Sequence, residues 1–343
     1  METFLIGRIQ LILYRFCLGF IVTIQTLFFS KKTKDFRMNV TIFTTINKPN
    51  VFLSLISMAS LNYFIPGIRF TVIDGGGLNR LHYLLFKLSK LNISFIEPNK
   101  DLKIKRMLNK YSYLLMYYKY GWSGKKFIHS LFQNKKGKII ILDLDTLFYK
   151  EPNEIINWIL SSKESNLYLE DYENFSVIST IEAKKILNAD LKKQRLNSGF
   201  ICISLDNFWH NNSASSLNFY IKKIIEIVNT RLKTDYLEKN PLDYLYPIIE
   251  QTLFWLALNK CNTKILSQKY LIYPKHLFKK AKLEDIKFIH FTGDIEKLPM
   301  YKYLLGSLKD NLLDKINGRQ KNDQPWYIYS GEYCRGCRHG ITD

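Results

Sequence analysis

The chain has 343 residues, of which 47% are hydrophobic and 23% charged, with 22 Tyr and 23 Phe. This composition excludes the disordered and low-complexity classes, and the length suits one large α/β domain with an appendage or two modest domains. The formal net charge of +20 indicates either an anionic partner or a Lys-rich composition without a specific target. Five cysteines form no even framework, so we expect reduced thiols in a cytosolic compartment.

Residues 1–37 form an apolar and basic N-terminal segment. The apolar stretch 9–29 contains one charged residue, Arg15, and four basic residues follow it between positions 31 and 37. A membrane-spanning helix, a helix lying in the membrane interface and a buried helix of the main fold all fit this pattern, and the sequence leaves the three open. If the segment contacts a membrane, its basic flank places the rest of the chain on the cytoplasmic side.

From Met38 onward, short apolar runs alternate with longer helical stretches, which is typical of βαβ units. We expect strands at Val40–Thr45, Arg69–Asp74, Ile93–Ile96 and Lys138–Leu142. Between them we expect helices at 49–64, after the glycines 75–77, and over the long region 101–133. Four of the five residues of 138–142 are Ile or Leu, so this strand should be buried on both faces of a mainly parallel sheet.

The second half is less regular. We expect strands near 167–169, 199–204 and 288–290, and helices near 213–231 and 248–259. We therefore expect residues 38–308 to form one α/β domain, a Rossmann-like, mainly parallel sheet with helices on both faces, and 309–343 to form a polar C-terminal tail.

Two aspartates, Asp143 and Asp145, follow the buried strand directly. Ligands of an open parallel sheet bind at the carboxyl ends of its strands, and alternation would point both carboxylates the same way. A hard cation such as Mg²⁺ or Mn²⁺ takes oxygen ligands and completes its shell with substrate phosphates. Taken alone, the pair is also explained as a turn or helix-capping motif.

Four further segments favour the metal site over the turn or helix-capping explanation. They are ILDLDTLFYKEP (141–152), LNSGFICISLDNFW (196–209), IEQTLFWLA (249–257) and FIHFTGDIEKLP (288–299), preceded by FTVIDGGGLNR (70–80). In their order and spacing they resemble glycosyltransferase family 8, the group of bacterial lipopolysaccharide galactosyl- and glucosyltransferases and glycogenin. The resemblance covers roughly residues 38–305 and implies the GT-A fold.

The resemblance implies a divalent metal site and a pair of residues at the reacting carbon. Asp143, Asp145 and His290 would hold Mn²⁺ or Mg²⁺, with Asp143 also close to the donor ribose; imidazole is a sound ligand for Mn²⁺. Glu250 and Gln251 match an acidic–Gln pair that contacts sugar hydroxyls near the anomeric carbon. Gln251 is a poor nucleophile, so the route to retention of configuration stays open.

The remaining implied donor contacts include several departures from the family pattern. Lys126 stands where an Arg is usual, and Glu296 stands where the phosphate-binding Lys is usual, so that contact shifts to Lys297. The first strand ends without the acidic residues that face uracil in relatives. The full set of donor-binding candidates is Thr44, Thr45, Asn47, Lys126, Asp143, Asn197, Ser198, Gly199, Gly293 and Lys297.

These features predict a metal-dependent hexosyltransferase. We expect it in the cytoplasm, where it could be free or bound to the cytoplasmic face of a membrane. It would move a hexose from a nucleotide-sugar, with UDP-glucose or UDP-galactose expected, to a saccharide or glycolipid hydroxyl, with retention. A haloacid-dehalogenase-type phosphatase with Asp143 as nucleophile is the alternative, although Gly-Thr does not follow Asp145 and three strand–helix units precede the motif. A non-enzymatic protein that binds nucleic acid or a membrane surface would explain the charge but not the ordered motifs, and we expect no specific nucleic acid partner.

Overall fold

The computed structural model describes residues 40–119, 121–171, 175–191, 195–232, 245–273 and 286–291. The first part of the chain contains β1 (Val40–Asn47), the 3-10 helix η1 (Lys48–Asn50), α2 (Val51–Phe64), β2 (Arg69–Gly76), α3 (Arg80–Leu88), β3 (Ile93–Ile96), α4 (Leu102–Leu108), α5 (Ser112–Lys119), α6 (Trp122–Phe132) and β4 (Lys138–Leu142). The second contains β5 (Thr146–Phe148), α7 (Asn153–Leu160), β6 (Asn166–Glu170), α8 (Thr180–Leu187), β7 (Leu196–Ser204), α9 (Leu205–Asn211), α10 (Ala214–Leu232), α12 (Leu245–Asn259), β8 (Thr263–Ile265), β9 (Tyr270–Tyr273) and β10 (Phe288–Phe291).

Seven of these strands form the central sheet, in the order β3-β2-β1-β4-β7-β6-β8. The pairs from β3 to β4 are parallel, β7 is antiparallel to both neighbours, and β8 is again parallel to β6. Within this sheet β7 thus runs against the direction of the other strands. The prediction of an α/β fold with a mainly parallel sheet is confirmed, and the carboxyl ends of β1, β2 and β4 meet at one edge.

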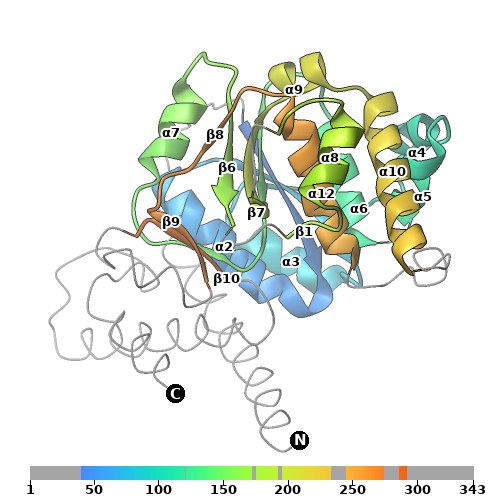
Figure 1. The fold of residues 1–343 in the computed structure, drawn as a ribbon. Helices are drawn as coiled ribbons and strands as arrows, with labels where there is room; N and C mark the ends of the chain where they lie inside the picture. Colours follow the sequence, from blue (N-terminus) through green and yellow to red (C-terminus); the bar gives the residue numbers. More distant parts are fainter. Residues whose placement is uncertain are drawn as a thin grey trace, which may run out of the picture.

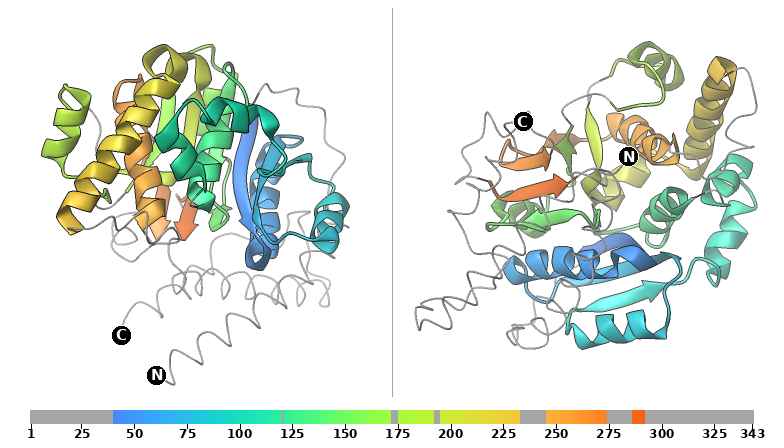
Figure 2. Two further views of the ribbon diagram at one scale, coloured as in Figure 1. Left: turned by 90° about the vertical axis from the view of Figure 1, so that its right-hand side faces the viewer. Right: turned by 90° about the horizontal axis from the view of Figure 1, so that it is seen from below.

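Helices cover both faces of the sheet, and the chemistry of β4 explains why. Ile140 and Leu142 pack into the core that includes α2, whereas Ile139 and Ile141 pack into the core beneath α6, α10 and α12. Because successive strand residues face opposite sides, an unbroken apolar run needs a helical layer on each side. The views in Figures 1 and 2 show α2 on one side of the sheet and α10 and α12 on the other.

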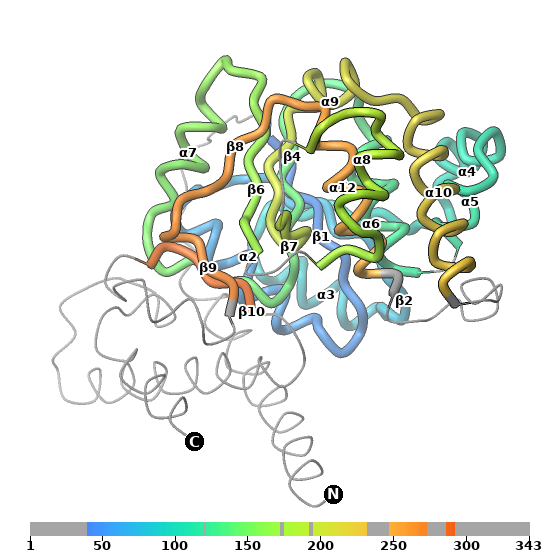
Figure 3. The backbone as a smooth tube through the Cα atoms, viewed as in Figure 1, coloured from blue at the N-terminus to red at the C-terminus, as the bar shows by residue number. Residues whose placement is uncertain are grey.

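A second, three-stranded sheet lies at the edge where β4 ends, with the order β5-β10-β9. Strand β10 is antiparallel to β5 and parallel to β9, and Figure 3 shows β9 and β10 near the lower end of the central sheet. Serines on α2 fix β5: Ser57 Oγ lies 2.7 Å from Thr146 Oγ1, and Ser60 Oγ accepts a hydrogen bond of 3.2 Å from Phe148 N. This small sheet brings the last described strand back to the end of β4.

The expected long helix over 101–133 is three shorter helices in the structure, α4, α5 and α6. Asp101 caps the first by accepting a hydrogen bond from Ile104 N, and Gly121 is the extended N-cap residue of the third. Since an N-cap residue has non-helical backbone angles, the glycine separates α6 from α5. In the part of the chain that the structure describes, no helix is long and apolar enough to cross a membrane, and residues 1–37 and 309–343 lie outside that part.

Candidate active site

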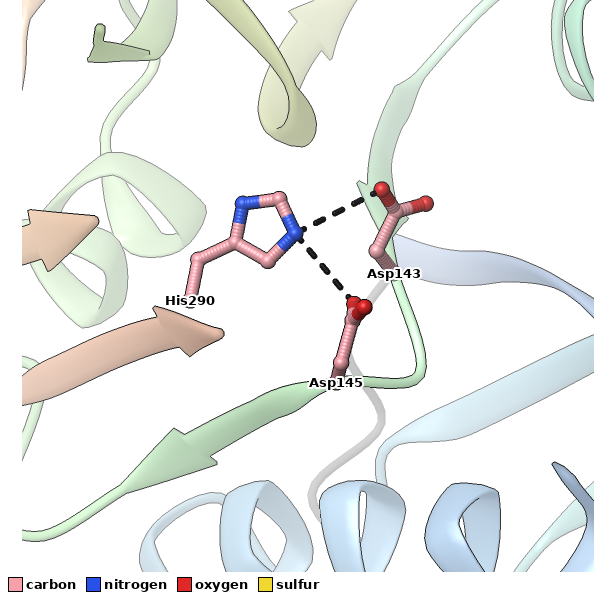
Figure 4. A group of neighbouring side chains, drawn as sticks. All are labelled: Asp143, Asp145 and His290. Carbon is pink, nitrogen blue, oxygen red and sulfur yellow. Dashed lines mark ion pairs between the residues drawn. The ribbon is translucent and has the colours of Figure 1, made fainter. Parts of the chain in front are cut away.

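Asp143, Asp145 and His290 converge at the carboxyl end of β4. Nε2 of His290 lies 3.2 Å from Asp145 Oδ1 and 3.7 Å from Asp143 Oδ2 (Figure 4). Strand pairing produces this approach: His290 is opposite Thr146 in the β5–β10 ladder, and Phe291 N donates a 2.7 Å hydrogen bond to Asp145 O. One ligand atom from each side chain lies within 4.8 Å of the others, which makes the group a candidate for holding a metal ion.

Asn197 on β7 determines how the imidazole is oriented. Its Nδ2 donates to Asp171 Oδ2 at 3.0 Å and its Oδ1 accepts from Gly199 N at 2.9 Å, which fixes the orientation of the amide. Nδ1 of His290 lies 3.0 Å from the same Oδ1, so it must carry a hydrogen and donate it. Nε2 is left to face the two aspartates, and metal-binding histidines are commonly oriented by such a hydrogen bond from the other ring nitrogen.

The charges around His290 favour its protonated form when only protein groups surround it. Burial by itself would lower the pKa of His290, but the hydrogen bond and charge of Asp145, with the charges of Asp143 and Asp171, raise it above the ordinary value. The protonated imidazole of His290 places a positive charge between the carboxylates, where a metal ion would otherwise supply it. Binding a metal at Nε2 would require the loss of that proton.

Gly199 on β7 makes room for the imidazole. A Cβ built at this position would lie 2.1 Å from His290 Cε1 and 2.5 Å from Nδ1. Real Cβ atoms are essentially never that close to another heavy atom, so the ring and a side chain at position 199 cannot share this space. Gly199 O also accepts a 2.8 Å hydrogen bond from Asp143 N, which extends the β4–β7 pairing to the first aspartate.

Lys126 on α6 lies between two acidic residues, and its side chain is 1% exposed. Its Nζ is 2.5 Å from Asp143 Oδ1 and 2.9 Å from Glu250 Oε1 on α12, and it also donates to Ser198 O at 3.4 Å. Burial raises the pKa of Glu250 to about 7 even with Lys126 beside it. For Lys126 burial acts in the opposite direction, but the carboxylates of Asp143 and Glu250 outweigh it and raise the pKa.

Gln251 on α12 joins a second set of hydrogen bonds around Asp171. Its Oε1 accepts from Ser198 N at 3.3 Å, and its Nε2 donates to Asp171 Oδ2 at 3.3 Å and to Phe175 O at 3.0 Å. Asp171, which directly follows β6 and is 5% exposed, was missed by the sequence analysis. A lone aspartate after a strand carries no distinguishing sequence signal; only folding shows that Asn197 and Gln251 share it.

Thr44, Thr45 and Asn47 lie at the carboxyl end of β1, in the strand next to β4. The hydroxyls of Thr44 and Thr45 and Oδ1 of Asn47 are buried and make no hydrogen bond with the described residues. Buried polar atoms are nearly always satisfied in folded proteins, so three at one strand end indicate a place where a polar ligand or ordered water belongs. A Cβ at Gly75 on β2 would meet Asn47 Oδ1 at 2.0 Å, so the glycine leaves space for that amide.

Most of the predicted site residues thus come together at one edge of the sheet. Gly293 and Lys297 lie outside the described residues. Asn197 and Gln251, expected to contact a donor sugar, use their amides for bonds within the protein, and Lys126 bonds acidic side chains. Cys202 and Cys261 are both buried.

The fold is similar to that of the galactosyltransferase LgtC in complex with donor and acceptor sugar analogues, with 15% identity and a TM-score of 0.41 over 74% of this chain and 87% of that one. Mouse xyloside xylosyltransferase 1 gives 11% identity and a TM-score of 0.42 over 73% of this chain and 96% of that one. A core-mannan synthase from Aspergillus fumigatus, in an Mn/GDP form, gives 10% identity and a TM-score of 0.44 over 68% of this chain and 74% of that one. No protein-family model and no curated protein matches the sequence.

Proposed function

We propose that this protein is a metal-dependent glycosyltransferase that moves a hexose from a nucleotide-sugar to a hydroxyl of a glycan or glycolipid. The observation that carries the proposal is the convergence of Asp143, Asp145 and His290 at the carboxyl end of the buried strand β4. UDP-glucose and UDP-galactose are the expected donors, and retention of configuration is the expected outcome, both from the motif resemblance. We propose that the enzyme works in the cytoplasm, either free or at the cytoplasmic face of a membrane.

The three side chains fit a divalent cation such as Mn²⁺ or Mg²⁺. Two carboxylates and one imidazole form a mixed oxygen and nitrogen donor set, which Mn²⁺ accepts and which leaves positions for diphosphate oxygens. The bound ion would supply Lewis-acid stabilisation of the departing diphosphate. Asn197 holds the imidazole with Nε2 toward the carboxylates, and Gly199 leaves the space that the ring needs.

The nucleoside part of the donor would lie against the end of β1. Thr44, Thr45 and Asn47 offer buried hydrogen-bonding atoms that the described protein does not use. Two hydroxyls and an amide accept or donate as the partner requires, so they suit a nucleobase or ribose. Because acidic residues are absent from this strand end, we propose hydroxyl and amide contacts to the base. From the resemblance, Lys297 is proposed as a phosphate contact and Gly293 as a further donor-binding residue.

In the transfer, the acceptor oxygen would form a bond to the anomeric carbon, the bond from that carbon to the diphosphate oxygen would break, and the proton of the acceptor hydroxyl would pass to an oxygen of the departing diphosphate. Glu250 and Gln251 are the residues we propose near this carbon. Glu250, with a pKa raised to about 7, can exchange a proton near neutral pH. Gln251 ties Ser198 N to Asp171, so it would fix the backbone of the donor-facing strand.

The decisive experiment compares nucleotide-sugar turnover by the wild type and by two variants. We expect the wild type, with Mn²⁺, to release nucleoside diphosphate from UDP-glucose or UDP-galactose, and Asp145→Asn to lose that release because the cation loses an anionic ligand. Asp190→Asn is the matched control, since Asp190 is exposed and paired with Lys184. Full activity of Asp145→Asn in the presence of a chelator would contradict the proposal.

The phosphatase alternative predicts release of inorganic phosphate from a phosphomonoester and no turnover of nucleotide-sugars. The geometry offers it no support: Asp143 Oδ1 is bonded to Lys126, and Oδ2 faces His290. A nucleophilic aspartate needs an oxygen open to in-line attack on phosphorus. The same preparations therefore separate the two functions by which product appears.

A further inference from the structure

A pocket lies at the end of the sheet opposite the proposed active site. Its cavity measures about 670 Å³. It is lined by residues of α4, the end of α6, α9 and the start of α10, and Lys135 of the pocket precedes β4, whereas Asp143 follows β4. In Figure 1, α9 lies at the upper end of the molecule and β10 toward the lower end. The volume is within the usual range of small-molecule sites.

Positive charge surrounds this pocket. Arg106, Lys110 and Lys135 line it, all three are exposed, and none forms an ion pair with the described residues. The lining residues include no aspartate or glutamate. The first residue of α10, Ala214, also lines the pocket, so the positive end of a 19-residue helix adds to the field. The arrangement favours an anion.

The wall of the pocket is aromatic. Phe132 and Trp209 pack edge to face with ring centroids 4.8 Å apart, and Tyr111 lies on the same lining. Asn212 also lines the pocket. Aromatic rings suit the apolar face of a sugar.

From these observations we propose that the pocket is a second, non-catalytic binding site for an anionic saccharide, that is, a sugar ring bearing a phosphate or a carboxylate. The cations hold the charged group, and the aromatic wall holds the ring. The proposal stands apart from the proposed function, because the residues that carry it lie away from Asp143, Asp145 and His290. A phosphate and a carboxylate share this chemistry, so the test uses one probe for each.

The test is isothermal titration of the full chain in chelator, so that no divalent cation occupies the proposed active site. Glucose 6-phosphate and glucuronic acid are the anionic probes, and glucose and inorganic phosphate are the controls that lack one half of the chemistry. We expect one or both anionic sugars to bind at least about ten-fold tighter than either control. Asp145→Asn should leave this binding unchanged.

A matched pair of double variants locates the binding. Arg106→Gln with Lys135→Gln should weaken the binding of the anionic sugar by about ten-fold or more. Lys103→Gln with Lys136→Gln removes the same charge from the same two segments, but neither residue lines the pocket, so affinity should change by less than about two-fold. Absence of saturable binding, equal loss in both pairs, inorganic phosphate binding as tightly as the sugar phosphate, or loss in Asp145→Asn would each overturn the proposal.

Discussion

Replacing Gly199 by alanine tests whether the imidazole of His290 holds a metal where the structure places it. The added Cβ would lie 2.1 Å from Cε1 of His290. An ordinary contact begins near 3.4 Å, so the ring must move by about 1.3 Å, the difference of the two distances. Gly199 has no left-handed backbone angle, so the backbone itself accepts alanine and the effect falls on the ring.

A displacement of this size matters because metal–ligand distances tolerate only about 0.2 Å. Moving the ring also disturbs the hydrogen bond between Nδ1 and Asn197 Oδ1, a type of contact whose loss typically lowers metal affinity by about 10–100-fold. We therefore expect Gly199→Ala to weaken Mn²⁺ binding by that factor, measured by titration of the ion with detection of free Mn²⁺ by electron paramagnetic resonance. Thermal unfolding in chelator would show whether the fold persists.

A double variant decides whether the effect passes through His290. If Gly199→Ala acts by moving the imidazole, adding it to His290→Ala should weaken Mn²⁺ binding no further, because the displaced group is already gone. Additive losses in the double variant would mean that the glycine acts on Asp143 or on the backbone instead. Wild-type affinity in Gly199→Ala alone would refute the inferred position of His290 at the metal.

Three further outcomes are expected. Lys126→Met should lower the free energy of unfolding by about 3–5 kcal/mol at neutral pH, measured with denaturant, because Glu250 is left buried beside Asp143 without a cation; the loss should shrink at acid pH, where Glu250 binds a proton. Mn²⁺ affinity should fall as pH falls through the raised pKa of His290, since the ion and the proton compete for Nε2; a pH-independent affinity in titrations would contradict this. Deletion of residues 1–30 should leave a folded, active protein that sediments less with vesicles, and an insoluble product would place this segment in the core.

Local sequence patterns were sufficient to predict much of the central sheet. The strands Ile93–Ile96 and Lys138–Leu142 occur with the expected bounds, because a run of β-branched and apolar residues between turn signals has few other stable conformations. The burial of residues 139–142 on both faces followed from composition alone. The position of Asp143 and Asp145 at a sheet edge followed from the same run, since the buried run 139–142 ends where these charged residues begin.

The sequence alone does not predict contacts that depend on which strands pair in a sheet. The short strand β5 carries no periodic signal, yet it is the element that pairs with β10 and brings His290 to Asp145. Resemblance, not local pattern, had suggested His290 as a ligand. Likewise, Asp171 acquires meaning only because Asn197 and Gln251 both reach it.

The same distinction applies to chemistry that depends on burial. The sequence shows a lysine at position 126 and a glutamate at position 250, which would be ordinary solvated charges on two helices. Packing of α6 and α12 against the sheet removes water from Lys126 and Glu250. Lys126 then pairs with Glu250 and with Asp143. Local preferences therefore determined the elements and the rim aspartates, whereas strand pairing and desolvation, which sum over residues far apart in the chain, decided which side chains meet and what charge they carry.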